Sequence, residues 1–161
     1  MHPVPHRRLF DFLRDVQTRH LWDSMSVGRS VQILAYITTG PDPSNCISVL
    51  AIGDQNDFLI LQECFTDSMG SFLIYAAISK ATFQSMLSGE DSDSIPLLPY
   101  GFSILPDVTT ATSGGNFEGT LMTVVFQILV ANMGDNPEET AVIAVSKLLR
   151  DMVKEINDTV N

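Results

Sequence analysis

The feature that most limits what this chain can fold into is one long amphipathic segment near its carboxyl end. Asn136 is a residue that caps helices, Pro137 suits the first helical position, and Glu138 and Glu139 suit the positive end of a helix dipole. Apolar side chains then recur along a single stripe: Ala141, Val145, Leu148, Met152, Ile156 and Val160. The spacing predicts a helix roughly 33 Å long, which is long enough to lie across a whole β-sheet.

The segment before this helix predicts a strand with one wholly apolar side. Within residues 120–131 the even-numbered positions are all apolar: Met122, Val124, Phe126, Ile128 and Val130. Alternate side chains of a strand point to opposite faces, so these five side chains share a face that must be covered. We expect the stripe of Val145, Leu148 and Met152 to cover it.

Four further segments predict strands joined by short turns, at residues 31–38, 46–53, 58–66 and 71–78. Short connections make consecutive strands antiparallel neighbours. Two short helices precede them, and a helix over 79–88, capped by Ser79 with Phe83, Met86 and Leu87 inward, follows. The sequence therefore predicts an α+β fold in which a curved antiparallel β-sheet packs around a long C-terminal α-helix.

Two later stretches are expected to depart from regular pairing. Residues 95–106 contain three prolines, which favours an edge strand because proline cannot donate a hydrogen bond to a neighbour. Residues 107–119 are rich in Thr, Ser and Gly, which favours a mobile loop.

Composition and charge exclude several classes of function. The 161 residues are 45% apolar and 17% charged, which is typical of one globular domain, and no apolar run approaches the roughly 20 residues that span a membrane. The formal net charge is −10, and residues 30–146 carry a single base, Lys80, against thirteen acidic side chains. Such a surface repels phosphate, so we expect no direct nucleic-acid contact by this chain.

The side chains that carry out catalysis or hold metals form no familiar pattern. His2 and His6 are four residues apart, but Pro3 and Pro5 prevent a regular helical pair, and His20 stands alone. Nucleophile-elbow, phosphate-loop and paired-cysteine motifs do not occur. We therefore expect no enzyme activity, no metal and no cofactor.

The two cysteines are expected to be reduced thiols on opposite faces of the sheet. If residues 54–57 form the hairpin turn, Gly53 lies opposite Phe58 and Cys46 lies opposite Phe65. Cys64 then points to the other face, so we expect two packed thiols rather than a bridge.

Two other side chains allow either a structural or a functional interpretation. Glu63 shares a strand face with Leu59, Leu61 and Phe65, so it either marks that face as solvated, which we favour, or is a buried carboxylate in a cavity. Trp22, the single tryptophan, is interpreted as a core anchor rather than as a platform for a ligand.

The order of these elements and several blocks of sequence resemble one known family. The blocks are Asp11-Phe12-Leu13-Arg14-Asp15 with Arg19 and Trp22-Asp23, Leu59-Ile60-Leu61-Gln62-Glu63, Leu97-Leu98-Pro99, Gly101-Phe102-Ser103-Ile104-Leu105-Pro106-Asp107, and residues 121–130. They resemble the START-adjacent C-terminal region of plant class IV homeodomain leucine-zipper transcription factors, and the match covers about residues 5–156. Tyr100 and Val108 depart from the residues usual in that family.

The resemblance implies a START-like helix-grip fold and a noncatalytic regulatory role. It implies that residues 1–161 form a single domain that lacks upstream strand residues of the full domain. It also implies a nuclear protein that binds DNA and dimerises through a homeodomain and a zipper outside this chain.

Two functions remain open for the domain itself. We favour protein interaction or homodimerisation, through the helices at the start of the chain or an unpaired sheet edge. The alternative is a module that senses a lipid or another small hydrophobic ligand. Its cavity would be lined by Phe126, Ile128, Val130, Val145, Leu148 and Met152. Side chains of this size could equally fill that space themselves.

Overall fold

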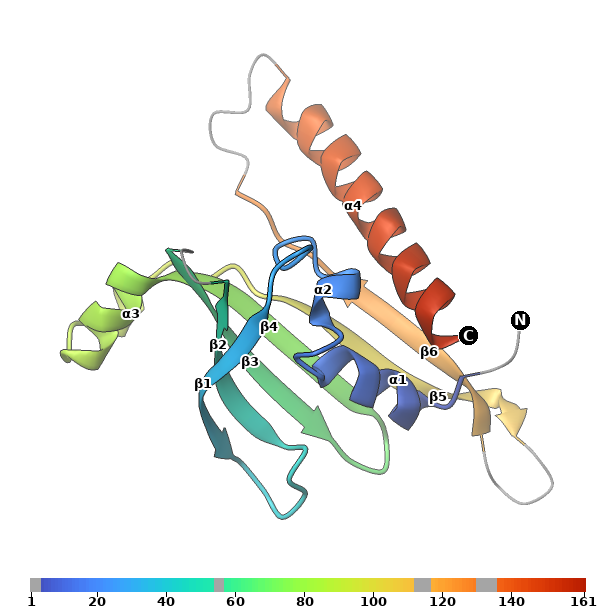
Figure 1. Cartoon of the computed structure of the whole chain (residues 1–161). Helices are drawn as coiled ribbons and strands as arrows, with labels where there is room; N and C mark the ends of the chain where they lie inside the picture. The colour runs from blue at the N-terminus through green and yellow to red at the C-terminus, as the bar shows by residue number, and fades with distance from the viewer. Residues whose placement is uncertain (1–3, 54–56, 112–116, 130–135) are drawn as a thin grey trace.

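A computed structural model describes residues 4–53, 57–111, 117–129 and 136–161 of the chain. The elements are α1 (His6–Arg14), α2 (Arg19–Trp22), β1 (Val31–Thr38), β2 (Cys46–Ile52), β3 (Phe58–Thr66), β4 (Ser71–Ser79), α3 (Lys80–Leu87), a short 3₁₀ turn η1 (Ser92–Ser94), β5 (Tyr100–Ala111), β6 (Phe117–Val125) and α4 (Pro137–Val160). Figure 1 shows a curved sheet with α1, α2 and α4 gathered on one side of it.

The six strands form one antiparallel sheet in the order β1-β2-β3-β4-β5-β6, so every neighbour in the sheet is also a neighbour in sequence. The predicted α+β fold, an antiparallel sheet with a long C-terminal helix, is confirmed. We call the side toward which Leu50, Ile60, Leu73 and Phe102 point the inner face, and the opposite side the outer face.

The main hydrophobic core lies between the inner face and the helices. Leu9, Phe10 and Leu13 of α1 are buried in it, because they repeat at helical spacing on one side of the helix. Trp22 follows from α2 and is only 3% exposed, which confirms it as a core anchor. Met152, Ile156 and Val160 of α4 complete the core, so the predicted stripe is the buried side of that helix.

Helix α4 is packed unevenly along its length. Its carboxyl-terminal half lies against α2 and the core, whereas Val142 and Ile143 near its start are exposed. Met122 and Val124 of β6 pack against the core, as the prediction of a covered even-numbered face requires, while Leu121 and Val125 on the odd-numbered side are exposed.

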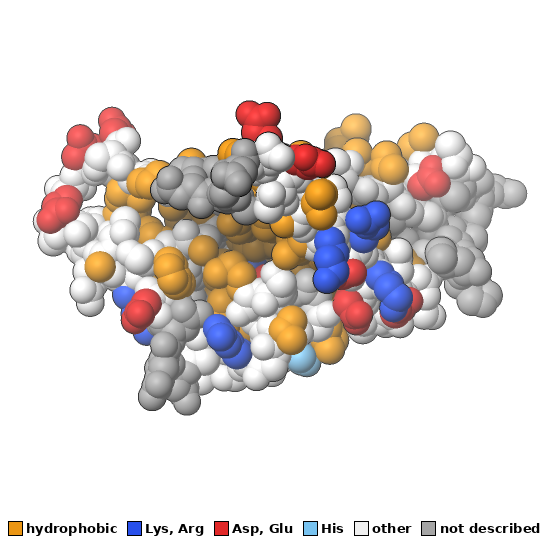
Figure 2. Space-filling view, turned by 90° about the horizontal axis from the view of Figure 1, so that it is seen from above, with side chains coloured by type: hydrophobic (Ala, Val, Ile, Leu, Met, Phe, Trp, Pro, Cys, Tyr) orange, Lys and Arg blue, Asp and Glu red, His pale blue; other side chains and the backbone are white. Residues whose placement is uncertain are grey.

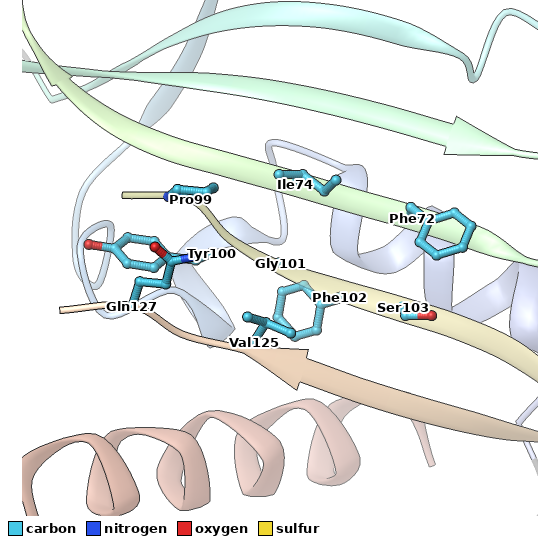
Figure 3. A pocket seen from close by; sticks show the side chains of 9 residues that line it. All are labelled: Phe72, Ile74, Pro99, Tyr100, Gly101, Phe102, Ser103, Val125 and Gln127. Atoms are coloured by element: carbon cyan, nitrogen blue, oxygen red, sulfur yellow. The ribbon is translucent and has the colours of Figure 1, made fainter. Parts of the chain in front are cut away.

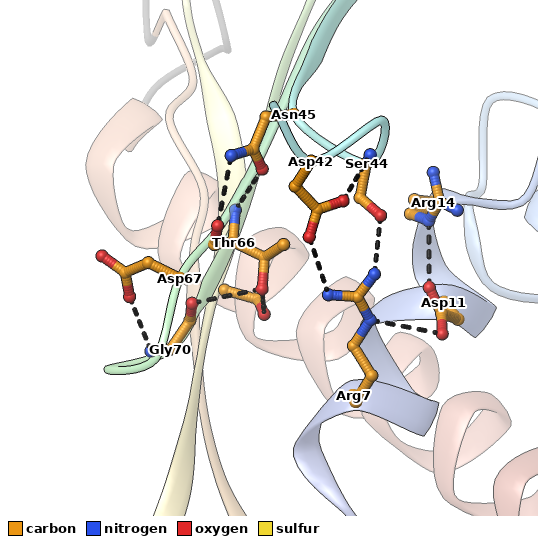
Figure 4. A network of polar contacts seen from close by, with 10 residues as sticks. Arg7, Asp11, Arg14, Asp42, Ser44, Asn45, Thr66, Asp67 and Gly70 are labelled. Atoms are coloured by element: carbon orange, nitrogen blue, oxygen red, sulfur yellow. Dashed lines mark hydrogen bonds and ion pairs between the residues drawn. The ribbon is translucent and has the colours of Figure 1, made fainter. Parts of the chain in front are cut away.

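Polar contacts attach α1 to the turn between β1 and β2 (Figure 4). Arg7 donates to the hydroxyl oxygen of Ser44 at 2.6 Å and lies 3.5 Å from a carboxylate oxygen of Asp42. Asn45 in the same turn holds the end of β3, because its side-chain amide both accepts from and donates to the backbone of Thr66. The helices and the sheet are therefore joined by hydrogen bonds as well as by apolar packing.

Helix α3 covers one end of the outer face. The hydroxyl of Ser79 accepts a hydrogen bond from the Thr82 backbone N–H at 3.0 Å, which confirms the predicted cap. Phe83 and Met86 pack on a small second core formed by Val49, Leu59 and Ile78. The prediction that Leu87 points inward is wrong: it is 73% exposed, because it is the last residue of α3 and lies beyond the small core on which Phe83 and Met86 pack.

The predicted edge strand is an interior strand. β5 pairs with β4 only over Tyr100–Ile104, and Pro106 comes after this pairing ends, facing Thr120 of β6. The missing N–H of Pro106 therefore costs no hydrogen bond to β4. Pairing with β6 resumes at Ala111 and Phe117, so strand structure extends into the predicted loop of residues 107–119; its centre, 112–116, lies outside the described residues.

The predicted register of the β2–β3 hairpin is wrong by one residue. Cys46 lies opposite Cys64, not opposite Phe65, and both thiols are free and on the inner face. Gly53 has a φ of 59°, and its N–H donates to the carbonyl oxygen of Ser30 instead of pairing with Phe58. The hairpin therefore ends at Ala51, and a shift of one residue reverses which side chains share a face.

Candidate functional site

The structure places five of the six predicted cavity-lining residues. Phe126, Ile128, Val145 and Leu148 are half-buried, Met152 is buried in the main core, and Val130 lies outside the described residues. Seen from above, the molecule is hollowed and hydrophobic side chains gather in the hollow (Figure 2). That these six residues line one cavity stays a prediction.

A chain of aromatic rings leads from partly exposed positions into the core. Phe126 stacks on Tyr100 with ring centroids 4.3 Å apart, and Tyr100 meets Tyr75 edge-on at 5.5 Å. Tyr75 in turn meets Trp22 edge-on at 5.9 Å. Phe126 and Tyr100 are half-buried, whereas Tyr75 and Trp22 are each 3% exposed.

A buried ion pair lies at the inner end of this aromatic chain. The Arg19 Nε–H donates to Asp23 Oδ2 at 2.8 Å, and the two side chains are 1% and 2% exposed. The Arg19 Nη1 donates to Gln62 Oε1, and the guanidinium lies over the rings of Trp22 and Tyr75, 4.9 and 4.5 Å from their centroids. Sequence reasoning did not identify Arg19 as buried; its spacing of four from Asp23 is the available signal, although most such pairs lie at the surface.

Two donors in this buried cluster have no hydrogen-bond partner among the described residues: Arg19 Nη2 and Trp22 Nε1. A buried donor without a partner costs about 1–3 kcal/mol, and native proteins contain few of them. Both donors come from α2, three residues apart.

The pKa directions agree with a site shielded from water. Burial, and secondarily the charge of Asp23, raises the pKa of the Tyr75 hydroxyl, and the same two causes raise that of Tyr100. Burial also raises the pKa of the Cys64 thiol to about 12, so this thiol stays neutral at physiological pH and is a poor nucleophile. No group of three or more His, Cys, Asp and Glu side chains in the described part of the chain is placed to hold a metal ion.

The outer face carries a second candidate site. Away from α3, six of its large apolar side chains are exposed, from 37% for Phe72 to 60% for Leu121; the other four are Ile47, Phe65, Ile74 and Val125. Glu63, opposite Ile74 on this face, is exposed, in agreement with the favoured interpretation of a solvated carboxylate. We call these six apolar residues the outer patch.

A pocket of about 260 Å³ opens beside the outer patch (Figure 3). It is lined by Phe72, Ile74, Pro99, Tyr100, Gly101, Phe102, Ser103, Val125 and Gln127, none of which is charged. Gly101 is required where β5 approaches β4, because a Cβ there would lie 2.7 Å from the carbonyl oxygen of Leu73. The pocket can therefore accept an apolar side chain from another molecule, with Ser103 and Gln127 as its polar side chains.

The fold defines a START-like α+β domain that carries two candidate binding sites. The chain matches the family model described as PDF2-like, C-terminal domain, over residues 1–161. It therefore belongs to the PDF2-like C-terminal domain family. No solved structure matches it.

The relatives that it resembles are plant homeobox-leucine zipper proteins. It is 40% identical to homeobox-leucine zipper protein HDG12 of Arabidopsis thaliana, over 99% of this chain and 23% of that protein. It is 41% identical to homeobox-leucine zipper protein HDG11 of the same plant, over 81% of this chain and 20% of that protein. It is 38% identical to homeobox-leucine zipper protein ROC8 of Oryza sativa subsp. japonica, over 99% of this chain and 26% of that protein. The chain thus spans between a fifth and about a quarter of the relatives it matches. None of the described helices is both long and apolar enough to cross a membrane.

Proposed function

We propose that this domain is a noncatalytic regulatory module of a nuclear homeobox-leucine zipper transcription factor, and that it acts by associating with a second copy of itself through the outer patch. DNA binding then belongs to parts of the protein outside this chain. The observation that carries the proposal is an apolar, almost uncharged sheet face with a pocket in it, which remains open to solvent in the monomer.

The second copy is the favoured partner because of the relatives' architecture. They are named leucine zipper proteins, and a zipper is a coiled coil that holds two chains together. Two tethered domains meet at an effective concentration that reaches the millimolar range, so even a weak patch can pair. A symmetric contact lets Phe72 or Ile74 of each copy enter the other's pocket.

The helices at the start of the chain are poor alternatives, because the apolar side of α1 is already buried in the core. The edge strand β1 is the competing surface: it is exposed over all but its first residue, and Ile37 is 70% exposed.

Sedimentation velocity at protein concentrations up to about 1 mM, the range that a tether sets, tests the proposal. We expect wild type to dimerise and Ile74→Lys, in the pocket, to remain monomeric. Val142→Lys on α4 and Ile37→Lys on β1 make the same charge change at positions 65% and 70% exposed, and both should still dimerise. Thermal unfolding confirms that each variant is folded.

Two results would contradict this assignment. Dimer loss in Ile37→Lys but not in Ile74→Lys would move the interface to the β1 edge. A wild-type domain that stays monomeric over the whole concentration range would remove self-association as its function.

A second candidate function is binding of a small hydrophobic ligand in the interior. It is supported by the hollow in Figure 2 and by the two unpaired donors of Arg19 and Trp22. Native mass spectrometry of protein purified from plant cells tests it. A bound mass that is released on unfolding supports this function, and a bare chain mass contradicts it.

A further inference from the structure

The interior cluster at α2 contains more hydrogen-bond donors than the chain's own acceptors satisfy. Arg19 uses Nε for Asp23 and Nη1 for Gln62, which leaves Nη2, and the indole Nε1 of Trp22 is also unpaired. Arg19 and Trp22 are 1% and 3% exposed, and guanidinium and indole groups can only donate. A group that pairs with either of these donors must therefore be a hydrogen-bond acceptor.

The charge of the cluster restricts that acceptor further. Arg19 is always positive, and Asp23 already neutralises it at 2.8 Å inside the core. A bound carboxylate or phosphate would leave the buried cluster with a net negative charge close to Asp23, which is unfavourable where water is excluded. The chain as a whole, with a net charge of −10, also repels anions.

The rest of the ligand must be apolar. Tyr75, Tyr100 and Phe126 form an unbroken series of ring contacts that starts at the cluster and ends at half-buried positions. Ile128, Val145 and Leu148 are half-buried as well. These side chains offer apolar surface but no charge.

We propose that Arg19 Nη2 and Trp22 Nε1 hold the uncharged oxygen of an apolar ligand, such as the carbonyl of an ester or ketone, whose hydrocarbon body lies along the aromatic series. This inference rests on the ligand-binding function proposed above and names its ligand class. The ion pair Arg19–Asp23 then orients the donors and selects neutral ligands over acids.

Trp22 supplies a direct reporter, because it is the only tryptophan and gives a single indole N–H resonance in a ¹⁵N-labelled domain. Three probes of similar length separate the contributions: methyl octanoate has a neutral acceptor, octanoate has a charged one, and octene has none. We expect methyl octanoate to move the indole resonance downfield in a saturable way. Octanoate should bind at least about tenfold more weakly, and octene should leave the resonance in place.

A pair of variants tests the role of the guanidinium. Arg19→Lys keeps a positive charge for Asp23 but removes the spare Nη2 donor, and it should weaken methyl octanoate binding about tenfold. Arg14→Lys is the matched control, because Arg14 pairs with Asp11 at the surface of α1, and it should leave binding unchanged. If Arg19→Lys does not fold, the three probes with the wild-type domain decide the question.

Each contrary result has a distinct meaning. If native mass spectrometry shows bound ester while the indole resonance does not move, the domain binds ligands elsewhere and the assignment to Arg19 and Trp22 is overturned. Binding of octanoate as tight as that of the ester would overturn the preference for neutral ligands, and an equal shift with octene would overturn the role of the acceptor. If no probe binds at all, ligand binding itself fails together with this inference.

Discussion

The inner and outer faces of the sheet contain the same kinds of side chain but differ in what covers them. Phe102 and Phe72 lie on neighbouring strands, next to each other in the register and on opposite faces. Phe102 is 2% exposed beneath the helices, whereas Phe72 is 37% exposed beside the pocket. Apolar alternation along a strand therefore shows which residues share a face, but not whether that face is closed.

The two faces also differ in their polar content. The covered inner side contains a buried ion pair with Gln62, while the described part of the open outer face has few charged residues, Glu63 on β3 and Asp107 on β5. This is the reverse of the usual distribution, in which charges face water. Both departures coincide with the surfaces to which we assign binding.

The largest expected difference in stability between the two faces is the one between alanine variants of Phe102 and Phe72. Phe102→Ala leaves a cavity in the main core and should lower the free energy of unfolding by about 3–5 kcal/mol. Phe72→Ala removes a partly solvated ring and should lower it by less than about 1 kcal/mol. Urea unfolding of both variants measures the difference, and equal losses would mean that the outer face is covered in solution.

Breaking the buried ion pair should lower the free energy of unfolding almost as much as Phe102→Ala does. Arg19→Met leaves Asp23 buried without its partner, which should lower the free energy of unfolding by about 3–5 kcal/mol. Arg14→Met, in the surface pair with Asp11, should lower it by at most about 1 kcal/mol, because water screens that pair. Guanidinium chloride is unsuitable here because its salt screens charges, so urea is used. A small effect in Arg19→Met would show that water reaches Asp23.

A side chain added at Gly101, in the wall of the pocket, tests how closely β5 approaches β4. Gly101→Ala places a methyl group on the outer face, 2.7 Å from the carbonyl oxygen of Leu73, so β5 must move away from β4. We expect a loss of about 1–3 kcal/mol in the free energy of unfolding and a weaker dimer. Unchanged stability would mean that the two strands are farther apart than the structure places them.

The smallest expected change in the free energy of unfolding is the one that the buried Cys64 thiol causes in alkaline solution. The folded domain holds the proton of Cys64 up to a pKa of about 12, whereas the unfolded chain loses it near the ordinary thiol value of 9.0. Above pH 9 the unfolded state therefore binds fewer protons, and stability should fall by up to about 1.4 kcal/mol per pH unit from this thiol, with Tyr75 contributing at still higher pH. Cys64→Ala should flatten the fall between pH 9 and pH 10 in urea unfolding experiments. An unchanged slope would assign the effect to other groups.

Local sequence patterns predicted most of the elements but not all of their relations. Residues close together in the sequence are enough to predict the apolar stripe on α4, the cap at Ser79 and the four strands before α3. The register of the β2–β3 hairpin does not, because Gly53 bonds to Ser30, a residue distant in sequence. The place of β5 in the sheet does not either, since it depends on where β4 stops pairing.

The apolar spacing along the chain requires one long helix and a set of alternating strands to share a core, because no other arrangement excludes water from both. The burial of Arg19 and Asp23 in that core and the open outer patch follow only from the assembled fold. Burial depends on which elements meet, and residues as far apart as Arg19 and Gln62 meet only once the sheet and the helices are assembled.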